Sequence, residues 1–198
     1  MPVHRSTYHY GNLRTALTDA ALELARHGGP AAVTVRGVAR SVGVTPPAAY
    51  RHFAEVEELM LAAKDRALML LAERVDAAIG AASAMGAVVD SAAGLRAVAE
   101  AYVGFARSCP GLFSMACHGS LAAVRVLMTD RFGPHLDALS NLDALSNRRP
   151  GMAFALWSVA HALAVFAAEG ASRGVPQDEA LDAMLAWIAG GAGAAARG

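Results

Sequence analysis

The chain has 198 residues, enough for one domain of moderate size or two small ones, and 55% of them are hydrophobic. Alanine and leucine are prominent in that fraction and aromatic residues make up only 6%, which favours helices over strands and predicts an all-α fold. Two cysteines exclude a disulfide-rich scaffold, and a formal net charge of zero, taken alone, argues against a nucleic-acid partner.

The average charge hides an asymmetry along the chain. Residues 1–53 hold six arginines against only Asp19 and Glu23, whereas the remaining residues have an acidic excess. A basic first part on an acidic remainder suggests that only the first part meets a polyanion, although a random scatter of a few charges gives the same pattern.

Short helices in succession are predicted for the basic part. The first begins at the N-cap residue Asn12 and ends in the His-Gly-Gly-Pro run at 27–30. Thr34 caps a second helix, which Gly43 ends. Thr45 caps a third helix, and a proline follows at its first helical position, where the missing N–H costs nothing.

The segment from Thr34 to Phe53 therefore has the pattern of a helix-turn-helix. Ala39 permits the close approach of two helices, and Gly43 tolerates a turn with positive φ. The outward side of the third helix is left for the DNA major groove, which accepts one α-helix. The predicted DNA-contacting residues are Arg36, Thr45, Pro46, Pro47, Ala48, Tyr50, Arg51 and His52. Tyr50 and His52 could instead close the small core, as we expect for Phe53.

The rest of the chain is predicted to be helical as well. We expect a head at 1–54, a connecting helix at 55–79 and a body at 80–198, with a break at 80–87. Helices are expected in the body at about 92–107, 112–118, 120–132, 151–172 and 176–189. The hexapeptide Leu-Asp-Ala-Leu-Ser-Asn occurs twice, at 136–141 and 142–147, and we expect a solvent-facing loop there.

One stretch of the body has nearly the length of a membrane span. Residues 150–168 contain no Asp, Glu, Lys or Arg. They are rich in alanine and stand alone, so we expect a helix buried all round within a bundle, and no membrane partner.

Three segments resemble the TetR/AcrR family of transcriptional regulators: YHYGNLR at 8–14, AVTVRGVARSVGVTPPAAYRHF at 32–53, and the acidic, leucine-bearing helix start that follows. The resemblance implies an all-helical homodimer whose two heads bind DNA at a palindromic operator. It also implies C-terminal helices that form a dimer interface and a pocket for a small-molecule effector, which usually ends repression. The chain departs from the family at Val56, where a phosphate-contacting lysine is common.

Residues 101–116 and 155–170 resemble the C-terminal domain of a subgroup marked by a Trp-x-x-x-His-Gly pattern, with Ala162 in place of the glycine. The residues that we expect near the effector are Phe113, Met115, Cys117, His118, Trp157 and His161. Phe113, Met115 and Trp157 fit a plain core equally well. His161 likewise fits a core or interface histidine.

Other classes of site find little support in the sequence. The spacing of Cys109, Cys117 and His118 is no recognised structural zinc pattern, so we expect no metal or cofactor. No Gly-rich phosphate loop, nucleophile elbow or His-Glu-x-x-His occurs, so we expect no enzyme. The polar N-terminus is no signal peptide, which predicts a cytoplasmic location. The alternative to a regulator is a helical enzyme or a ligand-binding protein with a non-functional head.

Overall fold

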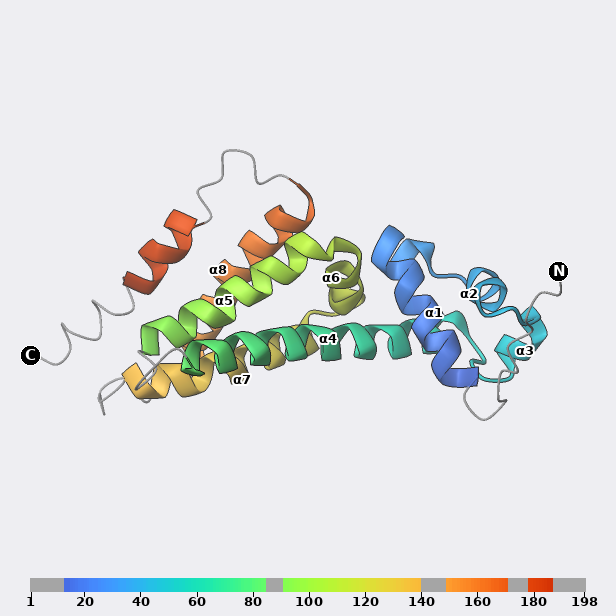
Figure 1. The fold of residues 1–198 in the computed structure, drawn as a ribbon, viewed down its shortest axis with the longest axis horizontal. Coiled ribbons are helices and arrows are strands. Elements are labelled where there is room, and N and C mark those ends of the chain that lie inside the picture. Colours follow the sequence, from blue (N-terminus) through green and yellow to red (C-terminus); the bar gives the residue numbers. More distant parts are fainter. Residues whose placement is uncertain (1–12, 85–90, 140–148, 171–177, 187–198) are drawn as a thin grey trace, which may run out of the picture.

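A computed structural model describes residues 13–84, 91–139, 149–170 and 178–186, and every regular element among them is helical. Figure 1 shows an elongated molecule with a small N-terminal head at one end and a helical body at the other, joined by one long helix. The all-α fold predicted from the sequence is confirmed. The elements are α1 (Leu13–Gly28), the 3-10 turn η2 (Pro30–Ala32), α2 (Val35–Val42), α3 (Pro46–Tyr50), α4 (Val56–Ala84), α5 (Ser91–Ser108), α6 (Pro110–Cys117), α7 (Ala122–Leu139), α8 (Arg149–Ala168) and a last helix over residues 178–186.

The head folds as its turn chemistry predicts. The Thr34 hydroxyl accepts a hydrogen bond of 3.1 Å from the Gly37 backbone N–H and so caps α2. Gly43 ends α2 with φ of 78°, the left-handed conformation that glycine adopts without strain. Thr45 occupies the N-cap position of α3, but its hydroxyl makes no capping hydrogen bond. The predicted N-cap of α1, Asn12, lies outside the described residues.

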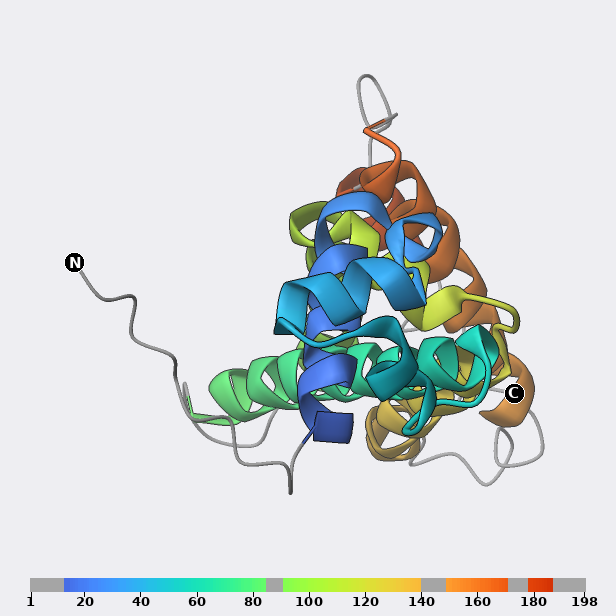
Figure 2. The same cartoon turned by 90° about the vertical axis from the view of Figure 1, so that its right-hand side faces the viewer.

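Helix α4 is longer than predicted and belongs to both parts of the molecule. Its buried face runs from Leu59 near the head to Val75 in the body. The break expected from residue 80 is wrong for residues 80–84, which continue the helix because alanine and serine at these positions keep good helical geometry. Figure 2, seen along the long axis, shows α4 crossing behind the lower part of α1.

Helix α5 lies at the centre of the body, where it packs against α4, α7 and α8. Because neighbours cover it on several sides, Tyr102 is fully buried and Phe105 is nearly so. The short helix α6 follows α5 directly. Pro110 is the first residue of α6, where its missing N–H costs nothing. Helix α6 contacts α1, α4 and η2 on the head side, so it lies at the junction of the two parts.

The first copy of the repeated hexapeptide begins inside a helix. Its first four residues belong to α7, where Leu136 is 3% exposed, because the Leu side chain finds a buried face at helical spacing. The expectation of a solvent-facing loop is therefore wrong for residues 136–139. Residues 140–147 lie outside the described part of the chain.

Helix α8 is buried on one side and not all round. Only 39% of Pro150–Ala168 is buried, and Phe154, Val159 and Phe166 are exposed in the single chain. By length and composition this is the one described helix that could cross a membrane, a test that a core helix also passes. Part of the apolar surface of α8 is therefore exposed to solvent in the described chain.

Candidate DNA-binding surface and aromatic cluster

The recognition helix α3 turns its apolar side inward and its functional side outward. Ala49 and, just beyond the helix, Phe53 are buried in the core of the head, as the sequence predicts for Phe53. Tyr50 is 50% exposed, so it does not close that core. Of the remaining predicted DNA contacts, Thr45, Pro47 and Arg51 are exposed, and Pro46, Ala48 and His52 are half-buried.

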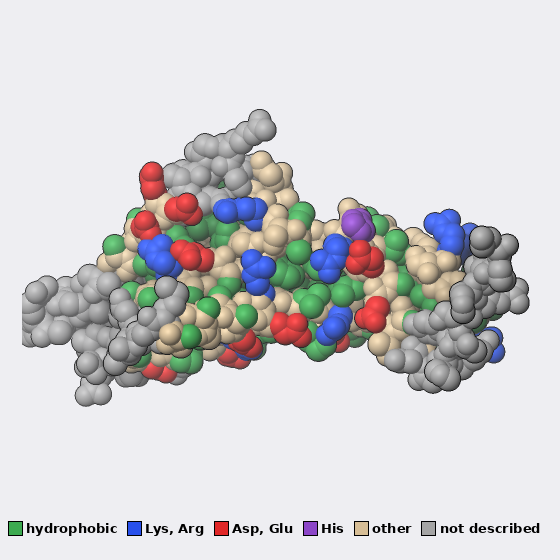
Figure 3. All heavy atoms as spheres, in the orientation of Figure 1, with side chains coloured by type: hydrophobic (Ala, Val, Ile, Leu, Met, Phe, Trp, Pro, Cys, Tyr) green, Lys and Arg blue, Asp and Glu red, His purple; other side chains and the backbone are tan. Residues whose placement is uncertain are grey.

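The same surface is basic. Arg36 and Arg40 project from the exposed side of α2, next in the fold to α3. In Figure 3 the outermost charged side chains at the head end are Lys or Arg, whereas both signs alternate along the body. This surface combines exposed guanidinium groups with a helix narrow enough for a groove, which are the requirements for phosphate and base contacts.

A side chain that the sequence analysis did not single out fixes the position of α3. The guanidinium of Arg14 donates to the carbonyl of His52, lies 4.2 Å from the centre of the Phe53 ring and pairs with Glu58 at 2.8 Å. The Glu58 carboxylate also accepts from the Ala54 backbone N–H at 3.1 Å, and Arg14 together with that N–H lowers its pKa. Arg14 therefore ties the start of α1 to the end of α3 and the start of α4.

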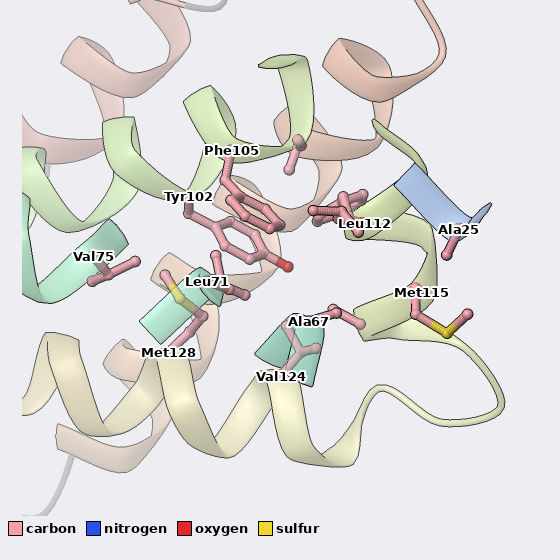
Figure 4. Packing of buried hydrophobic residues seen from close by; sticks show 14 of the residues in the cluster. Ala25, Ala67, Leu71, Val75, Tyr102, Phe105, Leu112, Met115, Val124 and Met128 are labelled. Atoms are coloured by element: carbon pink, nitrogen blue, oxygen red, sulfur yellow. The ribbon is translucent and has the colours of Figure 1, made fainter. Parts of the chain in front are cut away.

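In the body, three of the predicted effector residues meet in one aromatic cluster with Tyr102. We call Tyr102, Phe113, Trp157 and His161 the aromatic cluster. The Tyr102 and Phe113 rings meet edge to face at 5.6 Å, and the Trp157 and His161 rings stack at 5.2 Å. A hydrogen bond of 2.8 Å joins the Tyr102 hydroxyl to Nδ1 of His161. Figure 4 shows the Tyr102 ring among Leu71 of α4, Met128 of α7 and Leu112 of α6.

The titratable groups of this region are held in their neutral forms. Burial raises the pKa of Tyr102 far above its usual value, and burial lowers the pKa of His161. Burial also raises the pKa of the nearby Cys117 thiol to about 11, a value that makes a thiolate switch unfavourable at neutral pH. Among the described residues, no three His, Cys, Asp or Glu side chains gather closely enough to hold a metal ion.

Met115 and His118 lie apart from the aromatic cluster. Met115 is fully buried on the side of α6 that Figure 4 shows toward Ala25 of α1. His118 follows α6 and lines a cleft of about 490 Å³ between the head and the body, together with Val56 and Lys64. The predicted effector residues are thus divided between the inside of the body and its junction with the head.

Helix α6 is held by the head at both of its ends. Near its start, Gly111 lies so close to α1 that a Cβ there would be 2.1 Å from the Ala25 carbonyl oxygen. Beyond its end, the Lys64 ammonium of α4 donates to the carbonyls of His118 and Ser120, the latter at 2.8 Å. The one helix that carries Phe113 into the aromatic cluster therefore also contacts α1 and α4.

Known proteins share both the head sequence and the overall fold. Residues 17–63 match the family described as bacterial regulatory proteins, tetR family. The head is thus a helix-turn-helix DNA-binding domain of the TetR type. The subgroup with the Trp-x-x-x-His-Gly pattern remains a prediction for the body.

Three of the similar solved structures come from Rhodococcus. A protein with unknown function from Rhodococcus sp. RHA1 has a TM-score of 0.65 at 23% identity, covering 94% of this chain and 98% of that one. A TetR-like transcriptional regulator from the same source has a TM-score of 0.63 at 17% identity, covering 90% and 94%. A further transcriptional regulator from Rhodococcus sp. Rha1 has a TM-score of 0.57 at 21% identity, covering 90% and 96%. These likenesses show the fold, and no curated protein matches the sequence.

Proposed function

We propose that this chain is a homodimeric transcriptional regulator that binds a palindromic operator and is released from it by a small-molecule effector. The observation that carries the proposal is the exposed, basic surface of a TetR-type head, with Tyr50 and Arg51 outward. We assign base and phosphate contacts to the predicted residues of α2 and α3. Repression is the usual activity of such regulators, and we propose it here.

The exposed face of α8 supports the dimer. Its solvent-facing residues from 151 to 166 are all apolar or glycine: Gly151, Phe154, Ala155, Val159, Ala162 and Phe166. The small residues among them let a second helix approach closely, and burial of this apolar face would contribute roughly 25 cal/mol per Å². A two-fold axis at this face would set two heads on one side of the dimer, as half-sites of a palindrome require.

The contacts of α6 support a route for the effector signal. A molecule that enters beside Phe113 has to displace that ring, because the surrounding core is close-packed. A shift of Phe113 moves α6, and α6 rests on α1 at Gly111 and on α4 through Lys64. The effector would then favour a different position of the two heads, and the DNA-binding population would fall.

The alternative is a helical enzyme or a ligand-binding protein whose head no longer binds DNA. Both functions assign ligand binding to the body, and they differ in whether the head binds DNA. The departure at Val56 is the feature that favours it, since this partly buried side chain stands where a phosphate-contacting lysine is common.

Selection of DNA fragments tests the proposal. The purified protein is incubated with fragmented DNA of its source genome at moderate salt, and the retained fragments are sequenced. We expect enrichment of one short inverted repeat, and no enrichment by a matched variant with Arg36→Ala and Arg51→Ala. Retention without sequence preference, or equal enrichment by the variant, would contradict the proposal and favour the alternative.

A further inference from the structure

One buried hydrogen-bond donor of the aromatic cluster has no acceptor within the described chain. Trp157 is only 6% exposed, and its indole Nε1 is buried without a hydrogen-bond partner among the described residues. The Tyr102 hydroxyl lies near enough for this N–H to oppose the rise in its pKa, but the geometry is not that of a hydrogen bond. A buried donor left unpaired costs roughly 1–3 kcal/mol, so it is rarely left without a purpose.

Among the described residues, no ionised side chain pairs with a polar atom of the aromatic cluster. The Tyr102 hydroxyl and Nδ1 of His161 bond each other, and burial raises the pKa of Tyr102 and lowers that of His161, so both stay neutral. A carboxylate or ammonium placed here would lose its hydration without gaining a counter-charge.

The faces around the N–H are flat and aromatic. Trp157 stacks on His161 with 22° between the rings, and Phe113 lies 5.8 Å from His161 at 40°. Phe154 adds a further ring at 5.5 Å from Trp157. Such an arrangement favours another planar ring over a branched aliphatic chain.

An open groove on the outside of the body lies between α4 and α7. It has a volume of about 560 Å³, within the size range of small-molecule sites. Ala72 and Leu127 line it, whereas their chain neighbours Leu71 and Met128 are fully buried and lie beside Tyr102 in Figure 4. A molecule that reaches the aromatic cluster from this groove therefore has to displace Leu71 and Met128.

We infer that the effector is an uncharged, planar aromatic molecule with a hydrogen-bond acceptor, such as a carbonyl oxygen, that receives the Trp157 N–H. This inference rests on the proposed function only in calling the molecule an effector. The site consists of Trp157, His161, Phe113 and Tyr102. The lack of a counter-charge excludes carboxylates and alkylammonium ions, and the need for an acceptor excludes plain hydrocarbons.

Three probes of nearly equal shape test the inference by isothermal titration calorimetry. They are 2-acetylnaphthalene, which is neutral with a carbonyl acceptor, 2-isopropylnaphthalene, which lacks the acceptor, and 2-naphthoate, which is charged. We expect the ketone to bind about tenfold more tightly than the hydrocarbon, and the carboxylate to bind most weakly. The Trp157→Phe variant keeps a ring but lacks the N–H, so it should bind ketone and hydrocarbon equally.

Met128→Leu is the matched control, because it changes a buried side chain beside Tyr102 at nearly constant volume, lies outside the site and keeps the indole N–H. It should retain the preference for the ketone, and circular dichroism checks that both variants are folded. The inference is overturned if the carboxylate binds most tightly, if the ketone preference survives in Trp157→Phe, or if none of the probes binds. DNA selection with the same protein separates the two proposals. If the protein retains DNA but binds none of the probes, only this inference is contradicted. If it binds the probes but retains no DNA, only the proposed function is contradicted.

Discussion

The head and the body differ in where their functional side chains lie. The head presents Tyr50 and Arg51 to solvent on short helices fixed by caps and a glycine turn. The body buries Tyr102 and Trp157 in a core of apolar side chains. Recognition of a large polyanion needs an exposed, charged and rigid surface, whereas recognition of a small neutral molecule needs a dry interior. We propose that one chain meets both needs, with α6 between the DNA surface of the head and the aromatic cluster that its Phe113 enters.

The largest effect is expected from breaking the apolar face of α8. Val159→Asp puts an uncompensated charge into the proposed dimer interface and should weaken dimerisation by about 3 kcal/mol, or roughly 10²-fold. Operator affinity should fall with it, because two heads no longer bind together. Sedimentation of the protein and a DNA titration measure the two effects.

Val126→Asp provides the control for that variant. Val126 is 47% exposed on α7, against 36% for Val159, and it lines the groove between α4 and α7 and not the apolar face of α8. It should leave the dimer intact. Equal dimerisation of both aspartate variants would contradict the interface. The Ala160→Glu change is less informative, because Ala160 is fully buried within its own subunit.

The second effect concerns the junction between the two parts. Gly111→Ala forces a methyl group against the Ala25 carbonyl oxygen, so α6 must move from α1 at a cost of about 1–3 kcal/mol. We expect a lower melting temperature and weaker coupling between effector and DNA. Gly80→Ala, in open space within α4, is the matched control and should stabilise the chain by about 0.5–1 kcal/mol. A Gly111→Ala protein as stable as the wild type would show that the close contact with α1 is unimportant.

The head offers a gain of function. Val56→Lys places a cation at the first residue of α4. The salt dependence of binding, as log affinity against log salt concentration, should become steeper by about 0.9, with tighter binding at low salt. Val56→Gln gives a polar side chain without charge and should leave the slope unchanged. An unchanged slope in the lysine variant would place residue 56 away from the phosphates.

The smallest effect is a pH dependence of stability in the body. Burial lowers the pKa of His161 below its usual value of 6.5, so the unfolded chain takes up a proton at a higher pH than the folded one. The contribution of neutral His161 to the free energy of unfolding is fully present above about pH 6.5. It is lost as the pH falls toward the pKa of His161 in the folded chain. His135, half-buried on α7, acts in the same direction. Melting temperatures of His161→Gln should therefore fall less on acidification than those of the wild type, and equal slopes would refute this assignment.

The sequence predicted the head better than the body for a physical reason. Thr34, Gly43 and Pro46 act through local backbone geometry, so their positions alone indicate where helices begin and end. The aromatic cluster joins side chains from α5, α6 and α8, and Tyr102 and His161 are 59 residues apart in the sequence. Phe113, Trp157 and His161 were expected near one another through family resemblance, whereas Tyr102 was not. The separation of His118 from them depends on the direction of α6, which no local pattern encodes.

Arg14 illustrates the same limit within the head. Its partner Glu58 is 44 residues away, and both side chains are partly exposed, so nothing in the local sequence indicates the pair. Helix α8 shows a related difficulty, since a run of apolar residues predicts burial without saying whether the cover comes from the same chain. In the fold, α5 and α7 cover one side of α8, and apolar residues on its other side remain exposed.

The stoichiometry and salt dependence of binding to the enriched DNA duplex test the central claim most directly. Analytical ultracentrifugation should find two chains bound to one inverted repeat, with an affinity that falls steeply with salt. Arg51→Ala should lessen that slope by about 0.9 without changing the stoichiometry. One chain per duplex, or an affinity independent of salt and sequence, would contradict a dimeric regulator that reads DNA through this head.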